Sequence, residues 1–330
     1  MIIDLSALNT VTFNAQGTLA TIGGGALVKD VTDAAYEHNV QILTPNCECV
    51  GYAGGVLGGG YSRFMGLYGY GIDNIVSFNI VTADARLRTV GPNDPDLGFA
   101  VRGAGPNFGI VTSLTVRAYP TPKEQNGAWL GALIFDQAKV ESLVTAIEAL
   151  ELGPKMAIFM YFVTSGPPDF APVVVAFPFY VGTEEEGRAA FASIFAVGPL
   201  VDQTSWLQYN RVNEGSQPFC VKGGRKPSYG AGPSKLIPQD WRRIWNFYVE
   251  FLQNEGTGAS AVLLERYSLD KVKEIGDSRT SSYPWRDTFK YLAVAIPTYS
   301  DASLDGQANA FGTAVRSLWR STDPAIGNAT

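Results

Sequence analysis

The sequence predicts an α+β protein of two domains, and three observations support this prediction. The chain has 330 residues, which is enough for two domains of ordinary size. Apolar residues alternate at strand spacing in some segments and recur at helical spacing in others, with several strands following one another directly. Pro120 and Pro122 interrupt the pattern where a boundary would lie. We therefore expect one domain over residues 1–122 and a second over 123–330.

The first domain is predicted to combine short strands with two helices. Its strands are expected over 2–5, 19–22, 75–82, 87–90 and 114–118, and its helices over 27–38 and 97–102. His38, the only histidine of the chain, ends the first of these helices. A cation at a helix C-terminus interacts favourably with the helix dipole, so we expect a structural role for His38.

The second domain is predicted to be an antiparallel sheet with helices on one face. Thr183 and Glu186 form a capping-box pattern that begins one of the helices. Residues 197–238 are expected to be irregular. The remaining strands are expected over 129–135, 156–163, 173–181, 261–267 and 288–296, and the other helices over 136–151, 241–252 and 304–319, each with an apolar stripe.

Composition and charge narrow the function. The chain is 46% hydrophobic without a run of about twenty apolar residues, so we expect a globular protein and no membrane partner. A net charge of −6 and the lack of a basic stripe argue against nucleic acid. The N-terminus shows no signal-peptide pattern, which leaves the compartment open.

A glycine-rich stretch over residues 44–60 is the most informative part of the chain. Six glycines fall within residues 51–60, shortly after Cys47 and Cys49. Glycine lets another group lie almost against the backbone, at an entropic cost that suggests a purpose beyond folding. A tight loop between packed elements is the alternative interpretation. A second glycine-rich turn follows at 103–109.

Several kinds of chemistry are disfavoured. The single histidine and the lack of a Gly-x-Ser-x-Gly segment argue against a serine hydrolase. Three cysteines, Cys47, Cys49 and Cys220, make no disulfide framework and lack zinc-ligand spacing, so we expect no metal. The glycine run has no strand directly before it and no clear helix after it, which argues against a nicotinamide-binding Rossmann motif.

What remains is a backbone surface suited to a large flat ligand, with a thiol at one end. An ordered set of motifs then identifies a family. The chain closely resembles the berberine bridge enzyme-like flavoprotein oxidases of the vanillyl-alcohol oxidase superfamily, which have a PCMH-type FAD-binding domain. The resemblance covers residues 2 to 119 and rests on segments 3–6, 23–27, 47–55, 58–61, 71–74, 81–84, 96–97 and 107–112.

The resemblance implies an FAD cofactor lying between two subdomains and covered by the sheet of a second domain. Many family members tether the flavin through a cysteine at the position of Cys47. A small buried hydrophobic side chain is the alternative role for Cys47, and Cys49 is expected to be structural. The implied cofactor-binding residues are Cys47, Val50, Gly51, Gly54, Gly55, Gly58, Gly59, Gly60, Tyr61, Gly109, Ile110 and Val111.

The resemblance also implies the reaction. Family enzymes take a hydride from a carbon next to oxygen or nitrogen, helped by a tyrosine or glutamate base on the covering sheet. Tyr161, Glu265 and Tyr291 are the catalytic candidates, with Tyr267 as a fourth. Each is otherwise an ordinary strand residue, since periodicity alone does not tell which face looks at the flavin. Leu292 stands where family members carry an acid.

This sequence departs from the family pattern in two places, and the first departure, at the phosphate-binding loop, is expected to weaken FAD binding. The family has a subdomain before the position of Ile2, with the phosphate-binding loop and a linking histidine, and a C-terminal segment beyond the position of Thr330. The main hypothesis is an FAD-linked oxidase that oxidises an alcohol, a sugar or a secondary metabolite and passes electrons to molecular oxygen. The alternatives are a flavin-free, redox-neutral enzyme of cyclase or isomerase type, a binding protein, and an incomplete gene product.

Overall fold

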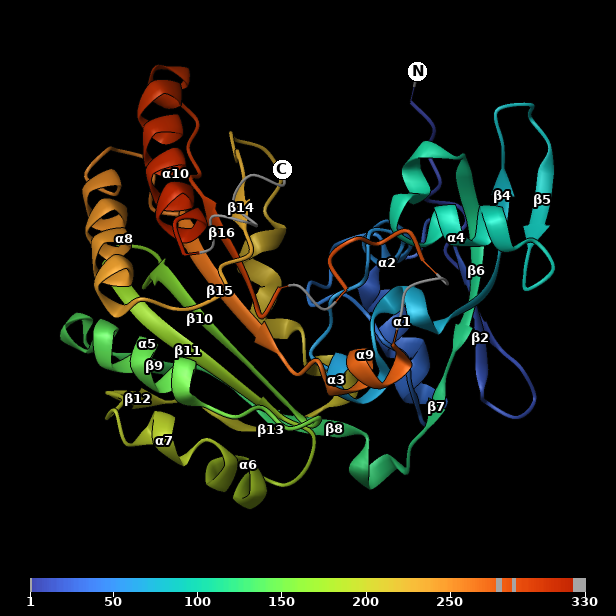
Figure 1. The fold of residues 1–330 in the computed structure, drawn as a ribbon, viewed down its shortest axis with the longest axis horizontal. Coiled ribbons are helices and arrows are strands. Elements are labelled where there is room, and N and C mark those ends of the chain that lie inside the picture. Colours follow the sequence, from blue (N-terminus) through green and yellow to red (C-terminus); the bar gives the residue numbers. More distant parts are fainter. Residues whose placement is uncertain (1, 277–280, 287–288, 323–330) are drawn as a thin grey trace.

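Two antiparallel sheets organise the protein, one in each half of the chain (Figure 1). The computed structural model describes residues 2–276, 281–286 and 289–322. All strands of the five-stranded sheet lie before Tyr119, and all strands of the nine-stranded sheet lie after Asn126. The connection between them passes close to the predicted boundary at residue 122.

The first half is built around the five-stranded sheet, in the order β1-β2-β6-β4-β5. Helices pack around this sheet, and β3 pairs with β7 in a separate two-stranded ribbon. Its elements are β1 (Val11–Phe13), β2 (Leu19–Gly23), α1 (Val28–Glu37), β3 (Val40–Gln41), α2 (Tyr52–Leu57), α3 (Met65–Tyr68), β4 (Ile75–Val81), β5 (Leu87–Val90), α4 (Pro95–Ala104), β6 (Ile110–Arg117) and β7 (Tyr119–Pro120).

The second half is built around the nine-stranded sheet. Its main order is β12-β9-β11-β10-β15-β16-β14, with β8 and β13 paired beside β11. The strands are β8 (Gly127–Leu130), β9 (Leu133–Phe135), β10 (Met156–Thr164), β11 (Pro172–Tyr180), β12 (Val201–Asp202), β13 (Ser205–Gln208), β14 (Tyr229–Ala231), β15 (Ala261–Tyr267) and β16 (Tyr291–Ile296).

Helices α5 (Val140–Ala149), α8 (Pro238–Phe251) and α10 (Asp305–Arg320) lie on the outer face of this sheet (Figure 1). Their apolar stripes and the sheet residues facing them form one buried core, which includes Phe162, Trp245 and Trp319. The smaller helices α6 (Glu184–Ala190) and α7 (Ala192–Phe195) lie beside this layer, whereas α9 (Asp270–Ile275) packs against α3 of the first half. The predicted arrangement, an antiparallel sheet with helices on one face, is confirmed.

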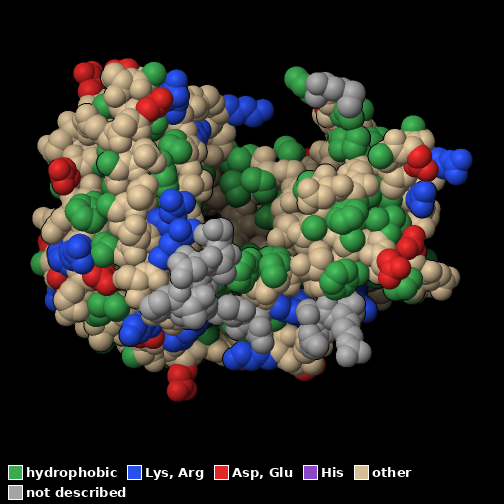
Figure 2. Space-filling model, turned by 45° about the horizontal axis from the view of Figure 1, so that its top comes forward, with side chains coloured by type: hydrophobic (Ala, Val, Ile, Leu, Met, Phe, Trp, Pro, Cys, Tyr) green, Lys and Arg blue, Asp and Glu red, His purple; other side chains and the backbone are tan. Residues whose placement is uncertain are grey.

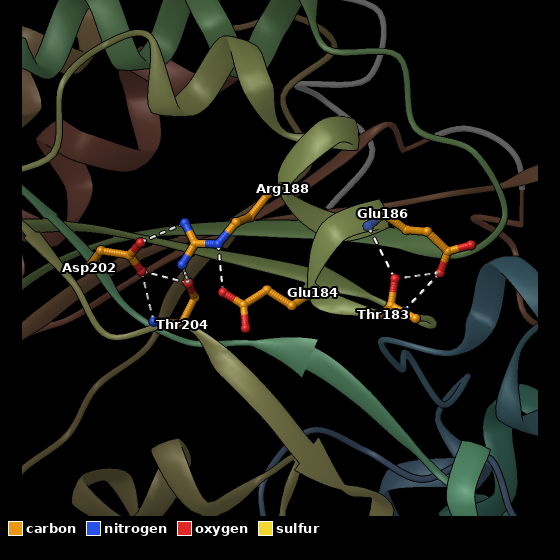
Figure 3. Close-up of polar contacts among 6 residues, drawn as sticks. All are labelled: Thr183, Glu184, Glu186, Arg188, Asp202 and Thr204. Carbon is orange, nitrogen blue, oxygen red and sulfur yellow. Dashed lines mark hydrogen bonds and ion pairs between the residues drawn. The ribbon is translucent and has the colours of Figure 1, made fainter.

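The capping box at α6 is also confirmed. Thr183 Oγ1 accepts a hydrogen bond from the Glu186 backbone N–H at 3.2 Å, and the Glu186 carboxylate accepts one from the Thr183 backbone N–H at 2.8 Å (Figure 3). One turn later, Arg188 forms ion pairs with Glu184 at 2.7 Å and with Asp202 at 2.8 Å. The exposed pairs hold α6 beside β12, so the sequence motif and a tertiary contact reinforce each other.

Three predictions about local structure were wrong. Residues 2–5 form no strand, and the first strand of the sheet is β1 instead. The glycine stretch contains a helix, α2, where we expected none, because Tyr52 and Val56 bury one side of it in the core. The segment 197–238 includes β12, β13 and β14. For the strand expected over 288–296, the structure describes β16 from Tyr291, and residue 288 lies outside the described residues.

His38 occupies the C-cap of α1, as predicted. Its Nδ1 lies 2.8 Å from the Ala34 carbonyl oxygen, and its ring stacks on Phe13. Among the described residues, we find no helix with the length and apolar character that crossing a bilayer requires.

A buried ion pair connects the two halves. Arg286, from the segment before β16, pairs with Asp73 on the other half, and the two side chains are only 6% and 4% exposed. Tyr70 adds to the contact, since its hydroxyl donates to the Arg286 carbonyl oxygen at 2.9 Å. Burial raises the pKa of the Asp73 carboxyl, and the Arg286 charge opposes that rise.

Removing one partner of this pair should destabilise the fold strongly, because a buried charge is left without compensation. We expect Arg286→Met to lower the free energy of unfolding by about 3 kcal/mol, measured by chemical denaturation. Arg225→Met is the matched control, because Arg225 forms an exposed ion pair with Asp305. It should cost less than about 1 kcal/mol. Equal effects of the two substitutions would contradict a structural role for the buried pair.

Candidate active site

A cavity of about 990 Å³ lies between the two halves. Figure 2 shows the molecule hollowed between its two lobes. The first half contributes the glycine stretch and α2, and the second half contributes the inner face of the large sheet and the segment 203–219. The face of the sheet that carries no helices therefore becomes a wall of the cavity.

The glycines of α2 form the opposite wall. Gly51 is the N-cap of α2, Gly54 lies within it and Gly58 is its C-cap, and their spacings of three and four place them on one side of the helix. A Cβ atom added at Gly51 or Gly54 would meet no atom within 4 Å, and at Gly58 only the Gly54 carbonyl oxygen at 3.8 Å. All three line the cavity, so the helix offers it a bare backbone surface.

This surface fits a flat ring system. Side chains at these positions would occupy the space beside the helix, whereas glycine leaves it open for a ligand to approach the backbone. The cavity is also lined by other predicted cofactor-binding residues, namely Cys47, Val50, Gly55, Gly60 and Tyr61.

Four predicted cofactor-binding residues do not line the cavity. Gly59 has φ +131°, and a Cβ there would lie 3.1 Å from the Tyr283 ring. Gly109 has φ +151°, and a Cβ there would lie 2.4 Å from the Val81 carbonyl oxygen. Ile110 and Val111 begin β6. Gly59 and Gly109 are therefore packing positions of the first half, and the role of all four residues in FAD binding stays a prediction.

A carboxylate held by two tyrosines is the main polar group on the sheet side. The Tyr161 hydroxyl donates to Glu265 Oε1 at 3.1 Å, and the Tyr267 hydroxyl donates to Glu265 Oε2. Asn46, next to Cys47, donates from Nδ2 to the Tyr267 oxygen at 2.7 Å. Tyr161 lies on β10, Glu265 and Tyr267 lie on β15, and Asn46 belongs to the glycine stretch. All four residues line the cavity.

Strand parity explains why these side chains meet. Glu265 and Tyr267 are two residues apart on β15 and therefore share a face. Tyr161 of β10 is paired with Leu263, so it lies diagonally beside Glu265 on that same face. Arg266, between the two, points to the other side, where its guanidinium contacts the Ile147 carbonyl oxygen of α5.

The same parity removes Tyr291 from the site. Tyr291 of β16 is paired with Arg266, so it faces the helices and not the cavity. Its hydroxyl donates to Glu148 of α5 at 2.6 Å, and the residue is 1% exposed within the outer core. Of the three predicted catalytic candidates, the structure brings Tyr161 and Glu265 together and places Tyr291 elsewhere.

The electrostatics of the cluster follow from its enclosure. Burial raises the pKa of Glu265, and this rise is opposed by the hydrogen bond from Tyr267 and by the charge of Arg63. Burial and the nearby Glu265 charge raise the pKa of Tyr161 and of Tyr267 well above the ordinary value. The tyrosines therefore keep their protons, and the carboxylate is the group able to accept one.

Sequence reasoning missed two cavity residues, Asn46 and Arg63. The Arg63 guanidinium lies 4.8 Å from the Phe159 ring centre and donates to Asn213 Oδ1 at 2.6 Å. The Arg63 backbone N–H donates to Asn46 Oδ1 at 3.0 Å. Asn46 lies within the glycine stretch and Arg63 shortly after it, and this proximity was the available signal, because an amide and a cation so close to the glycines are candidates for contact with the same ligand.

The cysteines also differ from expectation. Cys49 and Cys220 form a single disulfide across 171 residues, a pairing that we did not predict. Cys47 is free, half-buried and lines the cavity. Sequence spacing gave no hint of the bond, since only the docking of the two halves brings Cys220 to the glycine stretch.

Comparison with known proteins agrees with this geometry. Residues 1–91 match the FAD binding domain family. The chain is 32% identical over 324 residues to the FAD-linked oxidoreductase OXR1 of Pyricularia oryzae, covering 96% of this chain and 63% of that protein. It is 28% identical to the FAD-linked oxidoreductase hasG of Aspergillus fumigatus, covering 96% of this chain and 69% of that one. The chain is thus similar to FAD-linked oxidoreductases along nearly its whole length.

Solved structures share the fold of this chain. Xylooligosaccharide oxidase from Myceliophthora thermophila superposes with a TM-score of 0.78 at 19% identity, covering 98% of this chain and 70% of that one. The berberine bridge enzyme-like 1 protein of Physcomitrella patens gives 0.75 at 18% identity, covering 97% and 71%. The chain spans about two thirds of the length of the relatives that it matches, and its match to the FAD binding domain family supports FAD as the cofactor.

The glycine surface can be tested by filling it. Gly54→Val should fold normally, because the added side chain points into open space, yet should reduce FAD binding at least about tenfold by occupying the ring position. Flavin absorbance after reconstitution and gel filtration measures binding, and thermal denaturation measures folding. Gly306→Val is the matched control, since a Cβ at Gly306 in α10 also meets nothing within 4 Å. Equal flavin content in both variants would exclude this surface as the FAD contact.

Proposed function

We propose that this chain forms the flavin-facing and substrate-facing walls of an oxidase that converts an alcohol to a carbonyl compound and delivers the electrons to molecular oxygen. The observation that carries the proposal is the Glu265 carboxylate, held by Tyr161 and Tyr267 in the same cavity as the glycine surface of α2. A proton acceptor and a cradle for a flat redox cofactor are the two parts that alcohol oxidation requires.

FAD, when bound, supplies the acceptor for the hydride. Gly51, Gly54 and Gly58 would lie against it, and Cys47 stands at the position from which the resemblance implies a covalent tether. The chain's own residues supply the rest. Glu265 takes the hydroxyl proton as the C–H bond is broken, and the hydrogen bonds from Tyr161 and Tyr267 fix the direction of its lone pairs.

The apolar character of the cavity favours a substrate with an apolar body. Leu263, Ile296 and Phe177 cover much of the sheet side, and Leu130, Leu207 and Phe219 continue the apolar lining. A sugar would bury several hydroxyl groups against these side chains without hydrogen-bond partners, which is unfavourable. We therefore favour a secondary-metabolite alcohol among the substrate classes considered. The relatives are named as FAD-linked oxidoreductases, so their names do not favour the alternative hypothesis of a flavin-free enzyme.

Replacing the proposed base should abolish turnover without unfolding the protein. Glu265→Gln keeps the size of the side chain and should slow substrate oxidation by about 10²- to 10⁴-fold. Peroxide release in the FAD-loaded protein, tested on a panel of lipophilic and sugar alcohols, measures the rate. An unchanged rate on a substrate that the unaltered protein oxidises would exclude Glu265 as the base.

The pH dependence should report the raised pKa of Glu265. Activity should increase with pH through an inflection above the ordinary glutamate value of 4.5, because the base works as the carboxylate. Stability should change in the opposite direction: the folded state holds its proton more tightly than the unfolded one, so stability is lost as pH rises from the unfolded to the folded pKa. Denaturation of the unaltered protein and Glu265→Gln across this window would show a growing advantage for the variant.

Two tyrosines on opposite faces of the sheet provide a matched comparison. Tyr161→Phe removes a hydroxyl that orients Glu265 and should lower the oxidation rate about tenfold or more. Tyr291→Phe removes a hydroxyl that faces α5 and should leave that rate unchanged. Kinetics of both variants under one set of conditions test the assignment, and equal losses would mean that the sheet face has been misassigned.

A further inference from the structure

Three sulfur atoms meet at the edge of the cavity. Cys47 Sγ lies 3.5 Å from Cys49 Sγ and 3.9 Å from Cys220 Sγ, while Cys49 and Cys220 are joined as a disulfide. A free thiol in van der Waals contact with both sulfurs of a disulfide is the arrangement from which thiol–disulfide exchange begins. Cys49 is exposed, so the bond is accessible to solvent.

The segments that carry these cysteines are held together by other contacts. The Glu48 backbone N–H donates to Ser216 Oγ at 3.3 Å, and Gln217 Nε2 donates to Glu48 Oε2 at 2.5 Å. Ser216 and Gln217 lie in the 3₁₀ helix Glu214–Cys220 (η6), which ends at the third cysteine. The three sulfurs therefore stay close when the Cys49–Cys220 bond is broken.

Chain entropy does not distinguish Cys47 from Cys49 as the partner of Cys220. The two pairings would close loops of 173 and 171 residues, and loop-closure entropy varies only with the logarithm of length. A Cys47–Cys49 bond would instead release the long loop and lose that constraint. Local geometry alone decides between the two long-range pairings.

We propose that Cys47 exchanges with Cys49 as the disulfide partner of Cys220. The Cys47 thiolate moves behind the S–S bond and attacks Cys220 Sγ. A Cys47–Cys220 bond forms, the Cys49–Cys220 bond breaks, and Cys49 leaves as the thiolate and takes up the proton that Cys47 lost. One disulfide and one thiol are present before and after the step, so no external oxidant or reductant is needed.

The exchange controls the thiol that faces the cofactor. Cys47 lines the cavity, whereas Cys49 and Cys220 do not. With Cys49 bonded to Cys220, Cys47 is free for a bond to the flavin, and with Cys47 bonded to Cys220, no thiol faces the cavity. This consequence rests on the proposed function, because it requires Cys47 as the tether, whereas the exchange itself does not.

The first experiment forces the alternative pairing. Cys49→Ser leaves Cys47 and Cys220 as the only thiols, and the full chain is equilibrated with oxidised and reduced glutathione. Peptide mapping without reduction should show a Cys47–Cys220 disulfide. Cys47→Ser, which can form only Cys49–Cys220, is the matched control, and the two bonds should form at glutathione ratios within about tenfold of each other. Only glutathione adducts or free thiols in Cys49→Ser, with the bond formed in the control, would overturn the proposal.

The second experiment observes the exchange in the unaltered chain. The flavin-free protein is incubated at about pH 8, where thiolate is available, and then alkylated and mapped by mass spectrometry. The alkyl label should appear on Cys49 as well as on Cys47. Cys49 should carry on the order of one tenth of the total label or more, since loop closure gives neither pairing an advantage. Label confined to Cys47 after prolonged incubation would overturn the exchange. So would three labelled cysteines with bound zinc, which would make the cluster a metal site.

Loading with FAD separates the exchange from the tether. Where flavin remains attached after acid precipitation, label on Cys49 should fall in proportion, because Cys47 is no longer free to attack. If Cys49 is labelled in the flavin-free protein but no flavin is retained on denaturation, the tether at Cys47 is refuted and the exchange stands.

Discussion

The alternation of side chains across the nine-stranded sheet is the constraint on which the rest of the structure depends. One face of the sheet packs against α5, α8 and α10 and forms a continuous apolar core, and the other face forms a wall of the cavity. A shift of one residue along a strand would exchange the two sets of side chains. On β15 the shift would bury Glu265 among the helices and place Arg266 in the cavity.

The two walls of the cavity contribute different features to the site. The sheet supplies side chains at fixed positions. Among the residues that the structure describes, Glu265 is the only acidic one of the sheet that lines the cavity, and tyrosine hydroxyls engage both of its oxygens. The helix α2 presents bare backbone to the cavity, because glycines occupy the side that faces it. Rigid elements on both sides suit a site in which a ring system and a proton acceptor must keep a defined relation.

The site depends on how the two halves dock, because each half contributes only some of its residues. Asn46, on the glycine stretch, donates to Tyr267 on the sheet, and the Cys49–Cys220 bond joins the same stretch to η6. The Asp73–Arg286 pair holds a second point of contact away from these residues. Because the proposed base, the cofactor surface and the sulfur cluster all lie near this junction, small changes in docking should affect all three together.

The sequence by itself determined the fold class, most of the elements and the glycine surface. Helical stripes such as that of α8 and the capping box at Thr183 are local patterns, and each was read correctly because its physical cause lies within a few residues. Motif order in the first half was specific enough to indicate FAD. The tertiary structure decided the rest. Which face of β16 meets the cavity, which cysteine pairs with Cys220, and which glycines serve packing all depend on contacts between segments far apart in the chain. Periodicity indicates that the two faces of an element differ, but only the elements packed against it determine which residues each face contacts.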